Sequence, residues 1–277
     1  MNGDTPAEVV KAADRGRYLA TLFAPADKRP ALLSIYAFDA EVSRIAELAR
    51  DPLPGEIRLQ WWRDVVNGQR DGDAAGHPLA MALLAAIKTH DLPRSAFDAY
   101  CEARIFDFYQ DVMPDQTALE AYFGATQSAI IQLAAMILDR DAAKAASEAA
   151  GHAGVALGLE RMVRLLPLIR QKGQGFVPQP ILSAAGIPGG TSFANADAAA
   201  VRRVAAALSA LAESHLAKFR TAAVSIPAQL RPAFLSAASL PRRLKALERR
   251  RDIDTPAPDV SPLAATIDIL LAALRGR

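Results

Sequence analysis

The sequence predicts an all-α fold, organised as one domain over residues 1–277. Two observations lead to this prediction. Hydrophobic residues make up 51% of the chain and are largely Ala and Leu, which favour helix over sheet. No segment keeps the period-2 alternation of a strand long enough to matter. A chain of 277 residues is also long enough to bury a large core.

Proline and capping residues place the helices of the N-terminal half. Thr5-Pro6 reads as an N-cap followed by proline at the first helical position, which begins a helix toward Phe23. Residues 25–27 break the chain, and the next helix tolerates Pro30 in its early turn. Residues 51–55 form a tight connector and 68–76 a polar loop. The expected helices are 5–23, the segment from this break to about 49, then 56–67, 78–90, 93–111 and 115–138.

The C-terminal half begins with a long Ala-rich helix. We expect it to span 141–170, weakened by Gly151, Gly154 and Gly158 and then by Pro167. Residues 171–195 are rich in Gly and Pro and are the least regular region. The remaining expected helices are 196–225, 227–238, 241–251 and 263–274, with a linker at 255–258.

Charge and targeting signals limit the possible environments. The net charge is +2, and the basic residues lack interleaved aromatics, so we expect no nucleic-acid partner. Cys101 is the one cysteine, so no internal disulfide can form, which fits a reducing compartment. The first residues are polar and no uncharged apolar run spans a bilayer. We therefore expect a cytoplasmic protein that can lie peripherally on the inner membrane.

The segment from Tyr36 to Glu47 holds an unusual group of polar residues. Tyr36-Ala37-Phe38 leads into Asp39, Glu41, Ser43, Arg44 and Glu47. It resembles the first motif of the squalene/phytoene synthases, roughly YAFCRxxDDxxD. Further likenesses are Arg17 to Pro25, Leu59-Gln60-Trp61-Trp62-Arg63-Asp64 and Gly154 to Pro178. The resemblance covers about 15–274 and implies an isoprenoid synthase-type helical bundle around a central cavity.

Both aspartate motifs of that family are eroded in this chain. The paired aspartates of the first motif fall on Ser43 and Arg44, and its last acid survives as Glu47. The two aspartates of the second motif fall on Leu165 and Ile169. In the family these acids hold magnesium against a substrate diphosphate. The resemblance therefore leaves no metal site and no cofactor, unless Glu47 with Asp39 or Glu41 forms a divergent magnesium site.

The remnants of these motifs are the candidate site residues, and we assign none of them a catalytic role. The first remnant is Asp39, Glu41, Ser43, Arg44 and Glu47; the second is Arg161, Arg164, Leu165 and Ile169. Tyr36, Phe38, Arg44 and Arg164 are the candidates for a ligand pocket. The acids of the first remnant can line a former active site or form a solvated helix face. Arg161, Arg164 and Arg170 can bind a phosphate or an acidic partner, or neutralise those acids.

A basic cluster lies on the helix expected at 241–251. Its members are Arg242, Arg243, Lys245, Arg249, Arg250 and Arg251, and leucines recur on the same helix at positions 240, 244 and 247. Such a cluster can contact an anionic membrane or a partner. It can equally be the solvated face of a helix packed by its leucines. The four histidines show no metal-ligand spacing.

A subgroup related to the mitochondrial complex I assembly factor also keeps this scaffold with eroded aspartates. Likenesses to that subgroup are Tyr36 to Glu41, Gly173 to Pro178 and Leu240 to Leu244. They imply a non-enzymatic assembly factor or lipid-binding protein at the membrane, with respiratory complex I subunits or an isoprenoid or other lipid as partner. The alternative is a divergent Mg-dependent prenyltransferase that joins two prenyl diphosphates.

Overall fold

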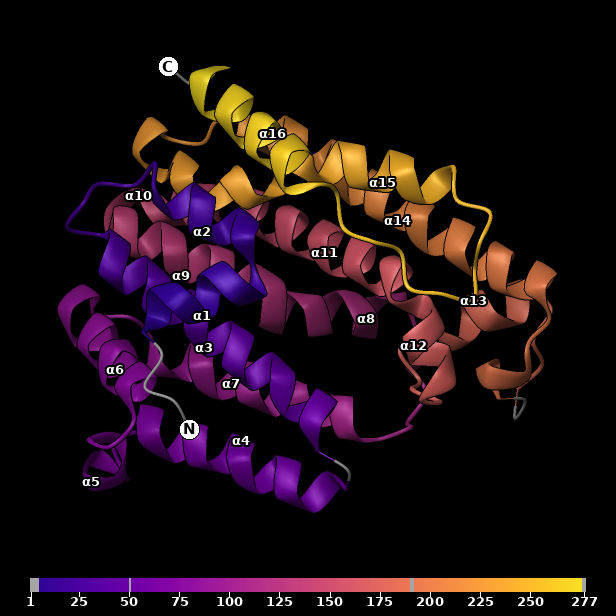
Figure 1. Cartoon of the computed structure of the whole chain (residues 1–277), viewed down its shortest axis with the longest axis horizontal. Coiled ribbons are helices and arrows are strands. Elements are labelled where there is room, and N and C mark those ends of the chain that lie inside the picture. Colours follow the sequence, from indigo (N-terminus) through magenta and orange to yellow (C-terminus); the bar gives the residue numbers. More distant parts are fainter. Residues whose placement is uncertain (1–4, 50, 190–191, 276–277) are drawn as a thin grey trace.

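The computed structural model describes residues 5–49, 51–189 and 192–275, and all regular structure in these residues is helical (Figure 1). The predicted fold class is therefore confirmed. The elements are α1 (Pro6–Ala13), α2 (Arg15–Thr21), α3 (Arg29–Leu48), α4 (Pro52–Val66), α5 (Asp71–Ala74), α6 (Pro78–His90), α7 (Arg94–Arg104), η1 (Ile105–Phe108), α8 (Gln116–Phe123), η2 (Gly124–Ser128), α9 (Ala129–Leu138), α10 (Arg140–Ala143), η3 (Lys144–Ala146), α11 (Ser147–Arg164), α12 (Leu166–Gln171), α13 (Gln179–Ala184), η4 (Phe193–Asn195), α14 (Ala198–Ala223), η5 (Ala228–Ser239), α15 (Leu240–Glu248) and α16 (Pro262–Arg275).

Several predicted boundaries are corrected by local chemistry. The expected helix at 5–23 divides at Asp14, whose backbone is non-helical and whose carboxylate accepts from the backbone N–H of Arg17. The long helix expected at 141–170 divides at Leu165, because Pro167 follows in the first turn of α12. The expected connector at 51–55 is already helical, since α4 begins at Pro52. The expected loops at 68–76 and 171–195 contain α5 and α13, and η5 is a 3₁₀-helix.

Two hydrophobic clusters fill the interior. The first surrounds α3, where Phe38 packs edge-on against Trp62 and Phe97. The second lies between α11 and α14, which run side by side along the molecule (Figure 1). The cavity described below lies among residues of α3, α7, α8, α11 and α12.

The helix from Gln116 to Leu138 runs through the middle of the fold. It comprises α8, a π-helical turn at η2 and α9. By length and composition it could cross a membrane, a feature that we did not expect from the sequence, and half of its apolar window is buried inside the protein. α11 packs closely on it: a Cβ on Gly154 would lie 2.4 Å from the backbone of Ser128. Gly154 therefore permits this close approach of α11 to the π-helical turn.

Candidate functional site

A cavity of about 400 Å³ lies where the two remnant motifs face each other. Its apolar wall comes from α8, α11, α12 and the segment after α12, and its polar wall from α3, α7, η1, α8 and the π-helical turn. The apolar wall contains Phe123, Met162, Leu165, Leu168, Ile169 and Phe176. The polar wall contains Ser43, Glu47, Arg104, Asp107, Tyr122, Thr126 and Gln127. The cavity therefore has the lining of an amphiphile site, apolar on one side and polar on the other.

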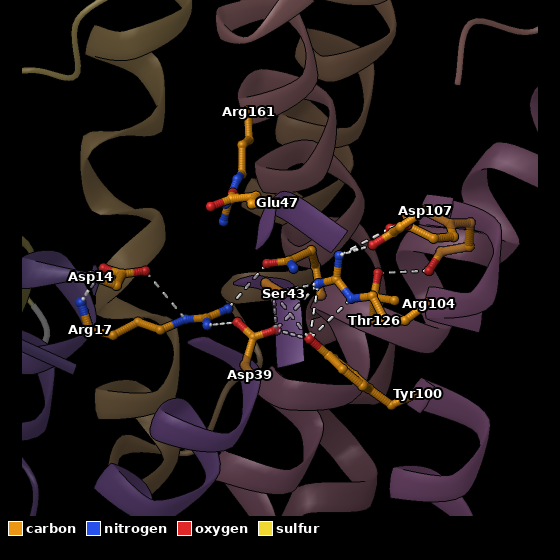
Figure 2. A network of polar contacts seen from close by, with 12 residues as sticks. Asp14, Arg17, Asp39, Ser43, Glu47, Tyr100, Arg104, Asp107, Thr126 and Arg161 are labelled. Atoms are coloured by element: carbon orange, nitrogen blue, oxygen red, sulfur yellow. Dashed lines mark hydrogen bonds and ion pairs between the residues drawn. The ribbon is translucent and has the colours of Figure 1, made fainter. Parts of the chain in front are cut away.

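The polar wall rests on a buried ionic network centred on Asp39 (Figure 2). Asp39 is 4% exposed and forms ion pairs with Arg17 and with Arg104. The hydroxyl of Tyr100 also donates to Asp39. Burial raises the pKa of Asp39, but the two arginines and this hydrogen bond more than offset burial and lower the pKa to about 2. Asp39 is therefore ionised and already neutralised by the protein.

Arg104 extends this network into the cavity. Its guanidinium donates to Ser43 Oγ at 2.9 Å and to Asp107 Oδ2 at 3.2 Å. The hydroxyl of Tyr122 donates to the other oxygen of Asp107 at 2.6 Å. Burial raises the pKa of both Asp107 and Tyr122. Two buried arginines thus face two buried carboxylates, and the network is balanced in charge without any added ion.

At the rim of the cavity, a residue of the second remnant faces a residue of the first. Arg161 Nη2 of α11 lies 3.8 Å from Glu47 Oε1 of α3, and both side chains are about half exposed (Figure 2). Lys172 adds a second exposed cation to the lining. Glu47, the one acid that survives at its position in the first motif, therefore faces an arginine.

These residues do not fit a magnesium cluster. Where the resemblance requires carboxylates, the cavity presents Ser43, Leu165 and Ile169. The two carboxylates that line it, Glu47 and Asp107, already face arginines. Within the part of the chain that the structure describes, no group of three or more His, Cys, Asp or Glu side chains could hold a metal ion. Magnesium needs near-octahedral oxygen ligation, which this wall does not offer.

The candidates for the ligand pocket lie elsewhere in the fold. Tyr36 and Phe38 are buried in the core around α3, where Arg17 lies over the ring of Tyr36. Arg44 is exposed, and neither it nor the half-buried Glu41 is among the described residues that line this cavity. Side chains on α3 point in different directions at each step of about 100°, so only Ser43, Ala46 and Glu47 reach the cavity from this helix.

Arg164 lies on the opposite side of α11, against a buried acid. Glu160 is 1% exposed, and its carboxylate lies 3.6 Å from Arg164 Nε and 3.7 Å from Arg243 Nη1. Burial raises the pKa of Glu160, and the two arginines oppose this effect. Arg170 is also structural, since its guanidinium donates to the backbone carbonyls of Ala194 and Ala196. Of the three arginines considered for anion binding, Arg161 alone lines this cavity.

The basic cluster divides into inward and outward members. Arg243 points inward to Glu160 and Asp259, and Arg250 pairs with Asp252 and donates to the carbonyl of Thr255. Three of the six proposed contact residues therefore hold the chain together, because Arg242 also pairs with Asp268 of α16, although its side chain is about half exposed. Exposed side chains are Arg242, Lys245, Arg249 and Arg251.

The sequence analysis identified Asp39 but missed its partners in the buried network. Arg17, Tyr100, Arg104 and Asp107 lie far from Asp39 along the chain, and no local pattern connects them. The sequence signal that came nearest to finding these partners was the family likeness from Arg17 to Pro25, because this stretch begins with Arg17. The histidines give a second example. His152 and His215 are 63 residues apart, yet their Nδ1 atoms lie 3.1 Å apart.

Comparison with known proteins places these features in a family. The model of the family "Squalene/phytoene synthase" matches residues 10–263. Complex I assembly factor 6 of Rattus norvegicus is 27% identical over 247 residues, which cover 87% of this chain and 72% of that protein. The presqualene diphosphate synthase of Zymomonas mobilis is 27% identical over 189 residues, covering 68% and 64%. A dehydrosqualene synthase structure superposes with a TM-score of 0.80 at 16% identity, covering 98% of this chain and 94% of that one.

Proposed function

We propose that this chain, which belongs to the squalene/phytoene synthase family, is a member of that family without catalytic activity. In this proposal the chain acts in assembling respiratory complex I and keeps the family's cavity for an isoprenoid or another lipid. One observation carries the proposal. The cavity walls that should hold magnesium present Ser43, Leu165 and Ile169, and arginines occupy the remaining carboxylates.

The physical reason concerns the leaving group of the enzymatic reaction. Ionisation of an allylic diphosphate places negative charge on that group, and bridging metal ions neutralise the charge in the transition state. Arg161 and Lys172 are the exposed cations of this lining, and both belong to the rim. They can attract an acidic headgroup without holding metal ions beside it. Binding without turnover is therefore the activity that the site supports.

The likeness to complex I assembly factors supports the assembly role. The assembly factors of Rattus norvegicus and Homo sapiens match over 87% of this chain, whereas the presqualene diphosphate synthase of Zymomonas mobilis matches over 68%. We accordingly propose complex I subunits as partners and a cytoplasmic protein peripheral to the inner membrane. Copurification of complex I subunits with the tagged chain from native membranes tests the partner. Recovery of no such subunit under conditions that retain membrane contacts would contradict it.

Calorimetric titration with a non-hydrolysable farnesyl or geranylgeranyl diphosphate analogue tests the cavity. We expect binding that is the same with and without magnesium, and no squalene- or phytoene-like product from the natural diphosphates. The likeness to presqualene diphosphate synthases keeps prenyl transfer as a second candidate. Binding that requires magnesium, together with turnover that Glu47→Ala abolishes in a folded protein, would favour that candidate.

A further inference from the structure

Helix α16 carries an exposed apolar stripe. Leu263, Ile267, Leu270, Leu271 and Leu274 are between 42% and 71% exposed. Their spacing of i, i+4, i+7, i+8 and i+11 keeps them within roughly 100° of the helix surface. This outer stripe, defined by these five residues, lies at the edge of the fold where α16 forms the top of the molecule in Figure 1.

The inner face of α16 packs with smaller residues. Ile269 is buried against Ala20 of α2 and Leu235 of η5, and Ala272 and Ala273 pack beside it. The helix therefore turns alanines and one isoleucine toward the protein and most of its leucines toward the outside. A surface helix of a globular protein normally does the reverse. A contiguous stripe of this kind marks a surface that contacts another apolar phase.

A row of cations on α15 begins next to α16. Arg242 of α15 donates to both carboxylate oxygens of Asp268 on α16 at 2.8 Å, so the two helices are joined at this point. Arg242 and Lys245 of α15 and its C-cap residue Arg249 recur at i, i+3 and i+7 and are exposed, while Leu240 and Leu244 are buried. An apolar stripe beside a row of cations is complementary to an anionic lipid surface, which offers acyl chains beneath negative headgroups.

We propose that the outer stripe of α16 inserts into the headgroup region of an anionic membrane, with the exposed cations of α15 on the phosphates. Interfacial binding of this kind grows with the apolar area buried and with the number of basic residues at the surface. This proposal gives residues to the peripheral membrane location proposed above. It does not depend on the ligand of the cavity or on complex I, so vesicle binding and diphosphate titration can fail separately.

Vesicle flotation of the full chain tests this surface. We expect flotation with phosphatidylcholine vesicles that contain phosphatidylglycerol, much weaker flotation with phosphatidylcholine alone, and loss of binding as salt rises. The double variant Ile267→Ser/Leu271→Ser should lower the apparent partition coefficient at least about tenfold. Leu53→Ser/Ile57→Ser on α4 is the matched control, because Leu53 and Ile57 have the same spacing and are 67% and 60% exposed. This control should bind like the unchanged chain.

A second variant tests the charges without touching α16. Lys245→Gln/Arg249→Gln should weaken binding to anionic vesicles and leave the weak binding to neutral vesicles unchanged. Equal losses in the α16 and α4 variants would overturn the proposal, as would equal binding to neutral and anionic vesicles. A solution mass above one chain that falls only in the α16 variant, without vesicle binding, would show a second copy on the stripe and would also overturn it.

Discussion

Replacement of Asp39 by Asn should destabilise the fold, because it removes the anion that two buried arginines share. The side chains of Arg17 and Arg104 are 7% and 11% exposed, so neither can regain full hydration. Arg17 keeps Asp14 at 3.6 Å, and Arg104 keeps Asp107 at 3.2 Å. The substitution thus weakens the charge balance of the network without leaving either arginine wholly unpaired.

The pKa of Asp39 gives the magnitude. It is lowered from 3.8 to about 2, and about 1.4 kcal/mol for each pH unit between these values gives about 2.5 kcal/mol. Removing one partner of a buried ion pair costs about 3 to 5 kcal/mol in general. Because each arginine keeps a second carboxylate, we expect Asp39→Asn to lower the free energy of unfolding by about 2 to 4 kcal/mol.

Urea denaturation followed by tryptophan fluorescence measures this loss, with an unchanged m-value as the check on two-state unfolding. Asp98→Asn is the matched control: Asp98 pairs with Arg63 at 2.9 Å on a partly exposed surface, so it should cost less than about 1 kcal/mol. Since the folded pKa of Asp39 is depressed, its contribution is present above pH 3.8 and fades as pH falls toward 2. A loss below about 1 kcal/mol at pH 7, or a loss that persists at pH 2, would refute the reasoning.

Three further predictions concern packing and reactivity. Gly154→Ala should lower the free energy of unfolding by about 1 to 3 kcal/mol, because the added Cβ would press on the backbone of Ser128. Gly151→Ala should raise it by up to about 1 kcal/mol, since no atom lies within 4 Å of the added Cβ. Equal shifts in melting temperature for the two variants would contradict this prediction. Ile169→Asp should cost several kcal/mol of unfolding free energy, with no recovery on adding magnesium; a magnesium-dependent gain in melting temperature would argue for a metal site. Burial raises the pKa of the Cys101 thiol to about 12. A thiol reagent at pH 8 should therefore modify the folded chain at least about a hundredfold more slowly than the unfolded chain. Similar rates for the two states would show that the thiol is accessible.

Local sequence signals determined most of the helices. Proline at the first turn and Thr5, His77, Asp115 and Asp197 as side-chain caps explain why several predicted starts agree with the structure. The errors occurred where a second cap or a proline interrupted an otherwise helical pattern. Asp14 divides α1 from α2, because its carboxylate accepts a hydrogen bond from the backbone N–H of Arg17. The glycines of α11 were read as weak points, although Gly154 permits close packing.

The candidate site could be located from the sequence but not described from it. Ser43, Glu47, Arg161, Leu165 and Ile169 line the cavity and came from the two motif positions. The sequence did not predict the arginines that balance the buried aspartates, because such an arginine can come from any helix that packs nearby. Side-chain direction on a helix depends on its exact rotation against its neighbours, which explains why Tyr36 and Phe38 point into the core instead.

The charge balance of the site gives the erosion of the motifs a physical meaning. Once Leu165 and Ile169 replace carboxylates, a cluster of metal ions in the cavity would lack neutralising ligands, and the acids left on α3 would repel each other without metal. Arg104 and Arg161 offset this repulsion by pairing with Asp39 and Glu47, respectively. The same substitutions leave an apolar wall that can hold a hydrocarbon chain. In the function that we propose, loss of metal chemistry and retention of a lipid-sized cavity are therefore compatible consequences of one set of residue changes.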